Sequence, residues 1–320
     1  MNFAGTLNYN HNNVDKLMDG VIASAHTNWG SSMRIPNYDY FVTEDEPIGL
    51  IQGFKSVGYY TVDDFNVANG VWTLKDGVPD CEVGNYVGGS YYNIPTNQKA
   101  FPGMAKFEDT DKDGKITTDD ATIVGRARAE LTGGFNLNGN YKNFDFALNF
   151  TYQIGGDVYN ANVMHSMMGN KDTALGQGRL AELGKTWRMF DVDASGELVA
   201  VTDPAALTAL NAHAKYALPY SEYGIVNSEF IEDASYLRLH TLTLGYTLPS
   251  TLTKTIGISR ARLYFTAGNV FCLKGYSGLD PDVNVSPSAD SSYSGFPTPN
   301  YDFRSYPKSR TYTFGLNVSF

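Results

Sequence analysis

The residues best suited to chemistry form one acidic stretch near the middle of the chain. Carboxylates occupy positions one, three and five of a twelve-residue loop, glycine occupies position six, and a carboxylate closes it at position twelve. This spacing lets alternate oxygen atoms converge on one hard cation, and it is typical of EF-hand calcium loops. The expected Ca²⁺ ligands are the side chains of Asp109, Asp111, Asp113 and Asp120 and the backbone carbonyl of Lys115.

Two features of this loop depart from the EF-hand pattern. Asp120 stands where EF-hands usually have Glu, and the shorter side chain weakens bidentate ligation. The preceding residues include Pro102 and Gly103 and do not predict an entering helix. We therefore expect an isolated structural calcium loop that braces an exposed segment. A solvated loop of Asx turns, without a metal, is the alternative.

Other candidate catalytic groups lack the spacing that catalysis requires. The five histidines show no metal-ligand spacing. Neither a nucleophile elbow nor a glycine-rich phosphate loop occurs. We expect no enzymatic activity, with a glycosidase as an open alternative because its two carboxylates leave no local signature.

Composition predicts an all-β protein with many turns. The 320 residues include 22 Tyr, 18 Phe and 32 Gly, and only 18% are charged. A net charge of −10 disfavours nucleic-acid binding. Cys81 and Cys272 are expected to be free thiols, with a disulfide as the alternative. No apolar run long enough for a transmembrane helix and no secretory signal is found, so the chain is either cytosolic or lacks its true amino terminus.

Strands with alternating apolar and polar residues are the elements that must position the acidic loop. Such alternation predicts a strand with one apolar and one polar face. The pattern is clearest at the carboxyl end, where Tyr312, Phe314, Leu316, Val318 and Phe320 share one face and the chain ends on an aromatic residue. Five further stretches share the pattern: 2–10, 131–142, 143–153, 236–248 and 262–273.

The connections between these strands are strongly unequal. Residues 142–143 form a tight hairpin and 249–260 a short link, whereas three other connections are far longer than a usual loop. Short turns at one end and long loops at the other are typical of outer-membrane barrels. A soluble β-sandwich with decorated loops is the alternative. The long connections are 12–130, 154–234 and 274–309.

Three local expectations follow from the residue pattern. A bulge or face switch is expected near His240, because the apolar residues before and after it have opposite parity. Residues 47–61 are expected to form a hairpin outside the membrane. Residues 170–189 and 203–216 have the Ala and Leu spacing of short helices.

Several ordered stretches together resemble the carboxy-terminal part of SusC/RagA-type TonB-dependent transporters of the Bacteroidota outer membrane. The resemblance extends along nearly the whole chain, and it favours the barrel over the sandwich. The stretches are Glu46–Gly49, Asp109–Asp120 with Gly125, Gly133–Phe135, Asn140–Asp145, Gly155–Asn160, Glu232–Leu239, Leu244–Pro249, Ala267–Phe271, Gly278–Pro281 and Phe314–Phe320.

The resemblance implies a fold and a location. The expected fold is a partial antiparallel transmembrane β-barrel, about six strands of a roughly 22-stranded barrel. Residues 1–320 would form its carboxy-terminal portion in the cell outer membrane, with the three long connections outside the cell. Such a chain is expected to be a fragment of a larger gene product or the product of a truncated open reading frame, because six strands alone leave two sheet edges unpaired in lipid.

The resemblance also implies a function and partners. The family imports glycans or peptides with a SusD-like lipoprotein and takes energy from the TonB complex, which would act through an amino-terminal part absent here. In the family the terminal strand is a signal for the barrel-assembly machinery, here Tyr312, Phe314, Leu316, Val318 and Phe320. The alternative function is a secreted calcium-braced β-sandwich that binds carbohydrate.

Overall fold

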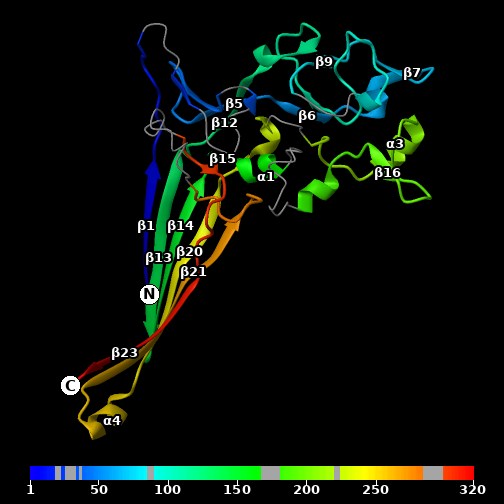
Figure 1. The fold of residues 1–320 in the computed structure, drawn as a ribbon. Helices are drawn as coiled ribbons and strands as arrows, with labels where there is room; N and C mark the ends of the chain where they lie inside the picture. The colour runs from blue at the N-terminus through cyan, green and yellow to red at the C-terminus, as the bar shows by residue number, and fades with distance from the viewer. Residues whose placement is uncertain are drawn as a thin grey trace.

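The computed structural model describes residues 1–18, 23–25, 34–35, 38–84, 90–166, 181–219, 224–283 and 298–320. Its largest element, here called the main sheet, has six antiparallel strands in the order β1-β13-β14-β20-β21-β23 (Figure 1). All six strands predicted from the sequence are confirmed, with ends within two residues of those expected. Their bounds are β1 Asn2–Tyr9, β13 Leu131–Tyr141, β14 Phe144–Ile154, β20 Tyr236–Thr247, β21 Arg260–Lys274 and β23 Thr311–Ser319.

The main sheet has one apolar and one polar face. Leu244, Phe265 and Phe314 lie side by side across neighbouring strands on the apolar face. Phe314 is 79% exposed, so this face is not covered by protein among the described residues. The alternation therefore gives a sheet whose apolar face is left open by the described residues.

A glycine on the polar face gives an ion pair room to cross a strand. Arg262 donates to both carboxylate oxygens of Asp145, at 2.9 and 2.5 Å, and joins β21 to β14 across β20 between them. A Cβ atom at Gly245 would lie 2.3 Å from the Arg262 guanidinium and 2.5 Å from the Asp145 carboxylate. Only glycine leaves this crossing open.

The face switch expected near His240 is confirmed as a bulge. The register between β20 and β21 shifts between Leu239 and Thr241, and the register with β14 shifts at the same height. In β21 the neighbouring Asn269 takes a left-handed conformation with φ +51°. The extra residue lets Leu239 share the apolar face with Leu242 although their spacing has the wrong parity.

The connections lie at opposite ends of the main sheet according to their length (Figure 1). The β13–β14 turn and a short helical link, α4 Ser250–Thr253 with the 3₁₀ turn η6 Lys254–Ile256, lie at one end. The long connections lie at the other end. This sidedness is the one predicted from the loop lengths.

The first long connection folds into small sheets with a shared core. Strands β4, β5 and β12 form most of one four-stranded sheet, and β6 pairs with β10. Its elements are β2 Ala23–Ala25, β3 Arg34–Ile35, β4 Tyr40–Val42, β5 Leu50–Gly53, β6 Ser56–Tyr59, η1 Val62–Asp64, β7 Phe65–Ala68, β8 Val71–Leu74, β9 Asp80–Cys81, β10 Ala105–Phe107, β11 Lys115–Ile116, η3 Thr118–Asp120 and β12 Thr122–Arg126.

The second and third long connections pack against the first. Together the three form what we call the loop body, and its core includes the buried Tyr40, Trp72, Tyr159, Phe230 and Tyr301. The remaining elements are β15 Asp157–Asn160, α1 Ala161–Ser166, η4 Ala181–Lys185, β16 Phe190–Val192, β17 Leu198–Ala200, α3 Pro204–Leu210, β18 Gly224–Ile225, η5 Ser228–Phe230, β19 Ile231–Asp233 and β22 Tyr301–Asp302.

Of the local predictions, the hairpin was wrong, the short helices were partly confirmed and the free cysteines were confirmed. Residues 47–61 do not form a hairpin, because β5 pairs with β4 and β12 while β6 pairs with β10. The helix expected in 203–216 is confirmed as α3, whereas 181–185 form the 3₁₀ turn η4 and residues 170–180 lie outside the described residues. Cys81 and Cys272 are both free thiols.

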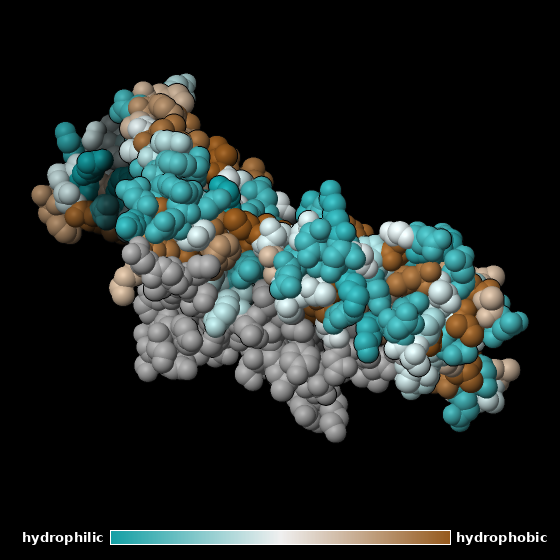
Figure 2. Space-filling model, turned by 90° about the horizontal axis from the view of Figure 1, so that it is seen from above, coloured by the Kyte–Doolittle hydropathy of each residue, from teal (hydrophilic) through white to brown (hydrophobic). Residues whose placement is uncertain are grey.

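The surface at the loop end is mixed in character. Seen from this end, hydrophilic side chains cover much of the described surface, with hydrophobic patches between them (Figure 2). Among the described residues, no helix combines the length and the hydrophobicity needed to cross a membrane.

Candidate functional site

The acidic loop brings three of its five predicted ligands together. Asp109, Asp111 and Asp120 each offer a carboxylate oxygen, and these oxygens lie within 4.8 Å of one another. The turn between them has the expected form. Gly114 has φ +88°, and its N–H donates to the Asp109 carboxylate at 2.9 Å.

The other two predicted ligands lie beside this group. The Asp113 carboxylate accepts a hydrogen bond from the Lys115 N–H at 2.8 Å and is not part of the three-carboxylate cluster. The Lys115 ammonium group pairs with Glu82 at 2.6 Å.

Asp120 closes the loop on itself. One carboxylate oxygen accepts from the N–H and hydroxyl of Thr110 at 2.7 and 3.0 Å, and the other accepts from the Thr117 N–H at 2.8 Å. Burial alone would raise the pKa of Asp120, but these hydrogen bonds outweigh burial and lower it. Both oxygens are thus engaged, and this arrangement differs from the bidentate role expected at position twelve.

The carboxylates of the cluster repel one another, and Asp111 shows the effect of this repulsion. The hydrogen bond from the Asp113 N–H lowers the pKa of Asp111, yet desolvation and the carboxylates of Asp113, Asp120 and Asp109 together raise it above its ordinary value. A divalent cation among these oxygens would relieve that repulsion, and all the donors are the hard oxygen ligands that Ca²⁺ prefers. The residues therefore fit the ion, and Ca²⁺ binding stays a prediction.

The apolar residues predicted on the last strand lie along β23 and just beyond it. Tyr312, Phe314 and Leu316 are 64%, 79% and 58% exposed, and Phe320 is 92% exposed. Val318 is half-buried on the same face. Phe265 of β21 lies against this row, with ring centroids 4.9 Å from Phe314 and 6.2 Å from Tyr312.

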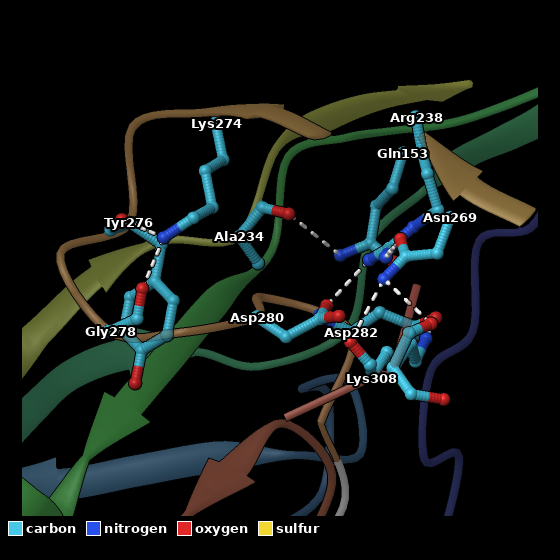
Figure 3. Close-up of polar contacts among 11 residues, drawn as sticks. Gln153, Ala234, Arg238, Asn269, Lys274, Tyr276, Gly278, Asp280, Asp282 and Lys308 are labelled. Carbon is cyan, nitrogen blue, oxygen red and sulfur yellow. Dashed lines mark hydrogen bonds and ion pairs between the residues drawn. The ribbon is translucent and has the colours of Figure 1, made fainter. Parts of the chain in front are cut away.

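A buried cluster around Arg238, for which the sequence predicted no role, is shown in Figure 3. The guanidinium of this β20 residue donates to Asp280 at 2.5 Å and to the Asn269 side-chain oxygen at 2.9 Å. The side chains of Arg238 and Asp280 are only 5% and 9% exposed. A buried pair of this kind fixes the third long connection onto the polar face of the main sheet.

Asn269 extends the cluster toward the last strand. Its side-chain amide donates to the Lys308 carbonyl at 3.0 Å, three residues before β23 begins. The Lys308 ammonium pairs with Asp282, and the Lys274 ammonium donates to the carbonyl oxygens of Tyr276, at 2.8 Å, and Gly278. Both ends of the third long connection are therefore held by contacts in and beside the Arg238 cluster.

A signal for this cluster was present in the sequence. Arg238, Asn269 and Asp280 come from three of the stretches that carry the family resemblance, 232–239, 267–271 and 278–281. Nothing in their spacing along the chain shows that they meet. Only the pairing of β20 with β21 brings them together.

Comparison with known proteins gives consistent relatives. No family model matches the chain. TonB-dependent receptor P3 of Formosa agariphila is 30% identical over 219 residues, which are 68% of this chain and 19% of that protein. TonB-dependent receptor SusC of Bacteroides thetaiotaomicron is 26% identical over 215 residues, 67% of this chain and 17% of that protein. The chain thus spans about one fifth of the length of the curated relatives it matches.

The fold comparison agrees with the sequence comparison. The RagAB peptide importer in its closed-closed state superposes with a TM-score of 0.59 at 19% identity, covering 99% of this chain and 27% of that chain. A second RagAB peptide transporter structure gives a TM-score of 0.57 at 18% identity. By sequence and by fold, the chain belongs to the SusC/RagA family of TonB-dependent receptors and matches part of their length.

Proposed function

We propose that this chain forms barrel wall and extracellular loops of a TonB-dependent transporter in the cell outer membrane. The observation that carries the proposal is the main sheet, whose apolar face is open while all long connections lie at one end. A soluble sandwich would cover that face with a second sheet, whereas a barrel turns it to lipid. The chain has no catalytic role in this proposal.

The proposed cargo is a glycan or a peptide, taken up with a SusD-like lipoprotein and energy from the TonB complex. Support comes from the relatives, which include SusC and the RagAB peptide importer. The loop body would face the outside of the cell and contribute to the substrate vestibule and the lipoprotein contact. Engagement with TonB would require a part of the receptor other than the residues described.

We further propose that β23 is read by the barrel-assembly machinery. Tyr312, Phe314, Leu316, Val318 and Phe320 form the row that supports this role, because they alternate with polar residues and end on an exposed aromatic side chain. In lipid the outer backbone edge of β23, which ends the main sheet, would pair with a further strand.

We also propose that the acidic loop binds Ca²⁺ as a structural ion. Asp109 and Asp111 would supply open carboxylates, Lys115 its carbonyl, and Asp113 a side-chain oxygen after giving up its hydrogen bond. Asp120 would contribute while holding the loop closed. The ion would neutralise the mutual repulsion of these groups.

Two neighbouring substitutions on opposite faces of β21 test the proposed membrane location. We expect Phe265→Lys to disfavour the inserted form by about 2–4 kcal/mol, because a charge on the lipid face is costly near the bilayer centre. The matched control is Thr266→Lys on the polar face. The measurement is the amount of protease-resistant protein in the outer-membrane fraction. Equal amounts of both variants, recovered as soluble protein, would instead support the secreted β-sandwich.

A further inference from the structure

A cavity of about 610 Å³ lies between the second and third long connections. Its walls come from β15, α1, η5, β19, β22 and the segments beside them. This volume lies within the range of roughly 300–1,000 Å³ that small-molecule sites occupy. Six charged residues line it, namely Glu229, Glu232, Asp302, Lys185, Lys215 and Arg304.

Two of the three carboxylates already have partners within the chain. Glu232 accepts from the N–H and the hydroxyl of Ser277, both at 2.7 Å, and from the Asn160 amide at 2.7 Å. Asp302 is 3% exposed, and its Oδ2 accepts from the Tyr276 hydroxyl at 2.6 Å, whereas its buried Oδ1 has no hydrogen-bond partner among the described residues. These two acids therefore hold the cavity wall together.

Glu229 is different, because its carboxylate has no hydrogen-bond or ion-pair partner among the described residues. Its backbone is fixed, since its N–H donates to the Asn227 side chain at 2.9 Å at the start of η5. The side chain lines the cavity and is partly exposed to solvent. This partial burial raises the pKa of Glu229 to about 7.

The basic residues of the cavity do not pair with the Glu229 carboxylate to neutralise its charge. Lys185, Lys215 and Arg304 line the same space, and none forms an ion pair with Glu229. Lys185 and Arg304 are engaged in other contacts. The cavity thus has a backbone-fixed acid without a cation, together with neutral groups such as Asn162 that donate and accept hydrogen bonds.

We propose that this cavity binds a small ligand through a primary ammonium group, which pairs with Glu229 while the surrounding amides and hydroxyls bind the rest of the ligand. An ammonium–carboxylate hydrogen bond is strong in a partly desolvated site. An amino sugar and a peptide amino terminus both carry such a group. The inference rests on the proposed function insofar as that function places the cavity on an import route. Its test measures ligand binding and does not require transport.

The test measures binding to the intact protein in detergent by calorimetry. The probes are a glucosamine disaccharide and trialanine, each compared with its N-acetylated counterpart at pH 7. We expect the free amines to bind about tenfold or more tightly than the acetylated forms. Affinity should fall about fivefold from pH 7 to pH 6, because the ionised fraction of Glu229 falls by that factor.

Glu229→Gln separates this inference from a general effect on the fold. The variant should lose both the preference for the amine and the pH dependence, while its melting temperature shows that it is folded. Glu197→Gln is the matched control, since Glu197 lies in the β16–β17 hairpin and does not line the cavity. Binding of only one of the two amines identifies the source of the ammonium group and supports the inference.

Three results would overturn the inference. The first is equal affinity for amines and acetylated probes, which would assign the cavity to neutral saccharides or peptides. The second is no binding of any probe, and the third is binding that is unchanged in Glu229→Gln. A protein that binds the amines but does not import them would contradict the proposed function and leave the binding site intact.

Discussion

The main sheet and the loop body use the same kinds of side chain in opposite ways. Phe314 in the sheet is 79% exposed, whereas Phe54 in the loop body is fully buried. Trp72 is also buried, with its ring edge-on to Phe65 and Tyr92 at centroid distances of 5.9 and 5.5 Å. The loop body therefore carries its own hydrophobic core, as a water-soluble domain does.

The main sheet instead depends on what surrounds it. Its strands are joined by backbone hydrogen bonds and by crossings such as Asp145–Arg262, and its apolar face has no protein cover among the described residues. In the proposed membrane location, lipid would supply the hydrophobic contribution to its stability. The two regions of the chain would then be stabilised in different solvents.

The largest expected effect tests whether the loop body has an independent core. Trp72→Ala should destabilise it by about 4 kcal/mol, because the substitution leaves a large cavity among buried rings. Phe314→Ala should cost less than about 1 kcal/mol in water, since its ring buries little surface there. Urea unfolding followed by tryptophan and tyrosine fluorescence measures both. Similar losses in the two variants would remove the contrast between the regions.

The next effect concerns the joint between the two regions. Arg238→Ala should destabilise the third connection by about 3 kcal/mol, because Asp280 would remain buried without its cation. Limited proteolysis between residues 274 and 309 should become faster. Arg188→Ala, outside this cluster, serves as the control. Unchanged protection in Arg238→Ala would mean that the ion pair does not hold the connection in place.

A smaller effect is expected from the acidic loop. Ca²⁺ at a hundred times its dissociation constant should stabilise the loop body by about 2.7 kcal/mol. The measurement is the melting temperature with Ca²⁺ and with chelator. Asp111→Asn should abolish the difference, whereas Asp193→Asn should not, because Asp193 forms a similar turn and no other carboxylate of the described residues converges with it. A melting temperature indifferent to Ca²⁺ would favour the metal-free Asx loop.

The smallest effect is a pH dependence in the loop body alone. The pKa of Glu229 is raised to about 7 in the folded protein, so the folded state binds more protons than the unfolded state between about pH 4.5 and 7. Stability should therefore fall as pH rises through this window. Glu229→Gln should be more stable than the natural protein by about 1 kcal/mol at pH 8 and equal to it at pH 4, a value discounted because the side chain is partly solvated. Parallel pH curves for the two proteins would contradict this cause.

The main sheet was predictable because its signal is local. Period-two alternation placed β13 and β14, and the disagreement in parity around His240 located the bulge. The acidic loop was equally local, since its turn depends on Gly114 and on carboxylates a few residues apart. Patterns within one strand or one turn are visible in the chain before it folds.

The loop body was much less predictable because its contacts are distant in sequence. β5 pairs with β12 about seventy residues later and not with the nearby β6. Nothing local in residues 47–61 distinguishes that arrangement from a hairpin. Glu229 likewise meets Asp302 and Ser277 across one cavity only because two long connections pack together.

The bulge at His240 also bears on how this sheet tolerates changes in strand length. Between two successive paired positions that the three strands share, β14 has no unpaired residue, β20 has one and β21 has two. Along this series each strand therefore has one residue more than the strand before it at the bulge. The side chains on either side of the bulge nevertheless keep their places on the apolar and polar faces. Deleting His240 would leave Leu239 and Thr241 on opposite faces, as they already are. At the bulge the sheet can lose a residue without exchanging its faces, whereas a deletion in the middle of β14 would move its apolar side chains to the polar face.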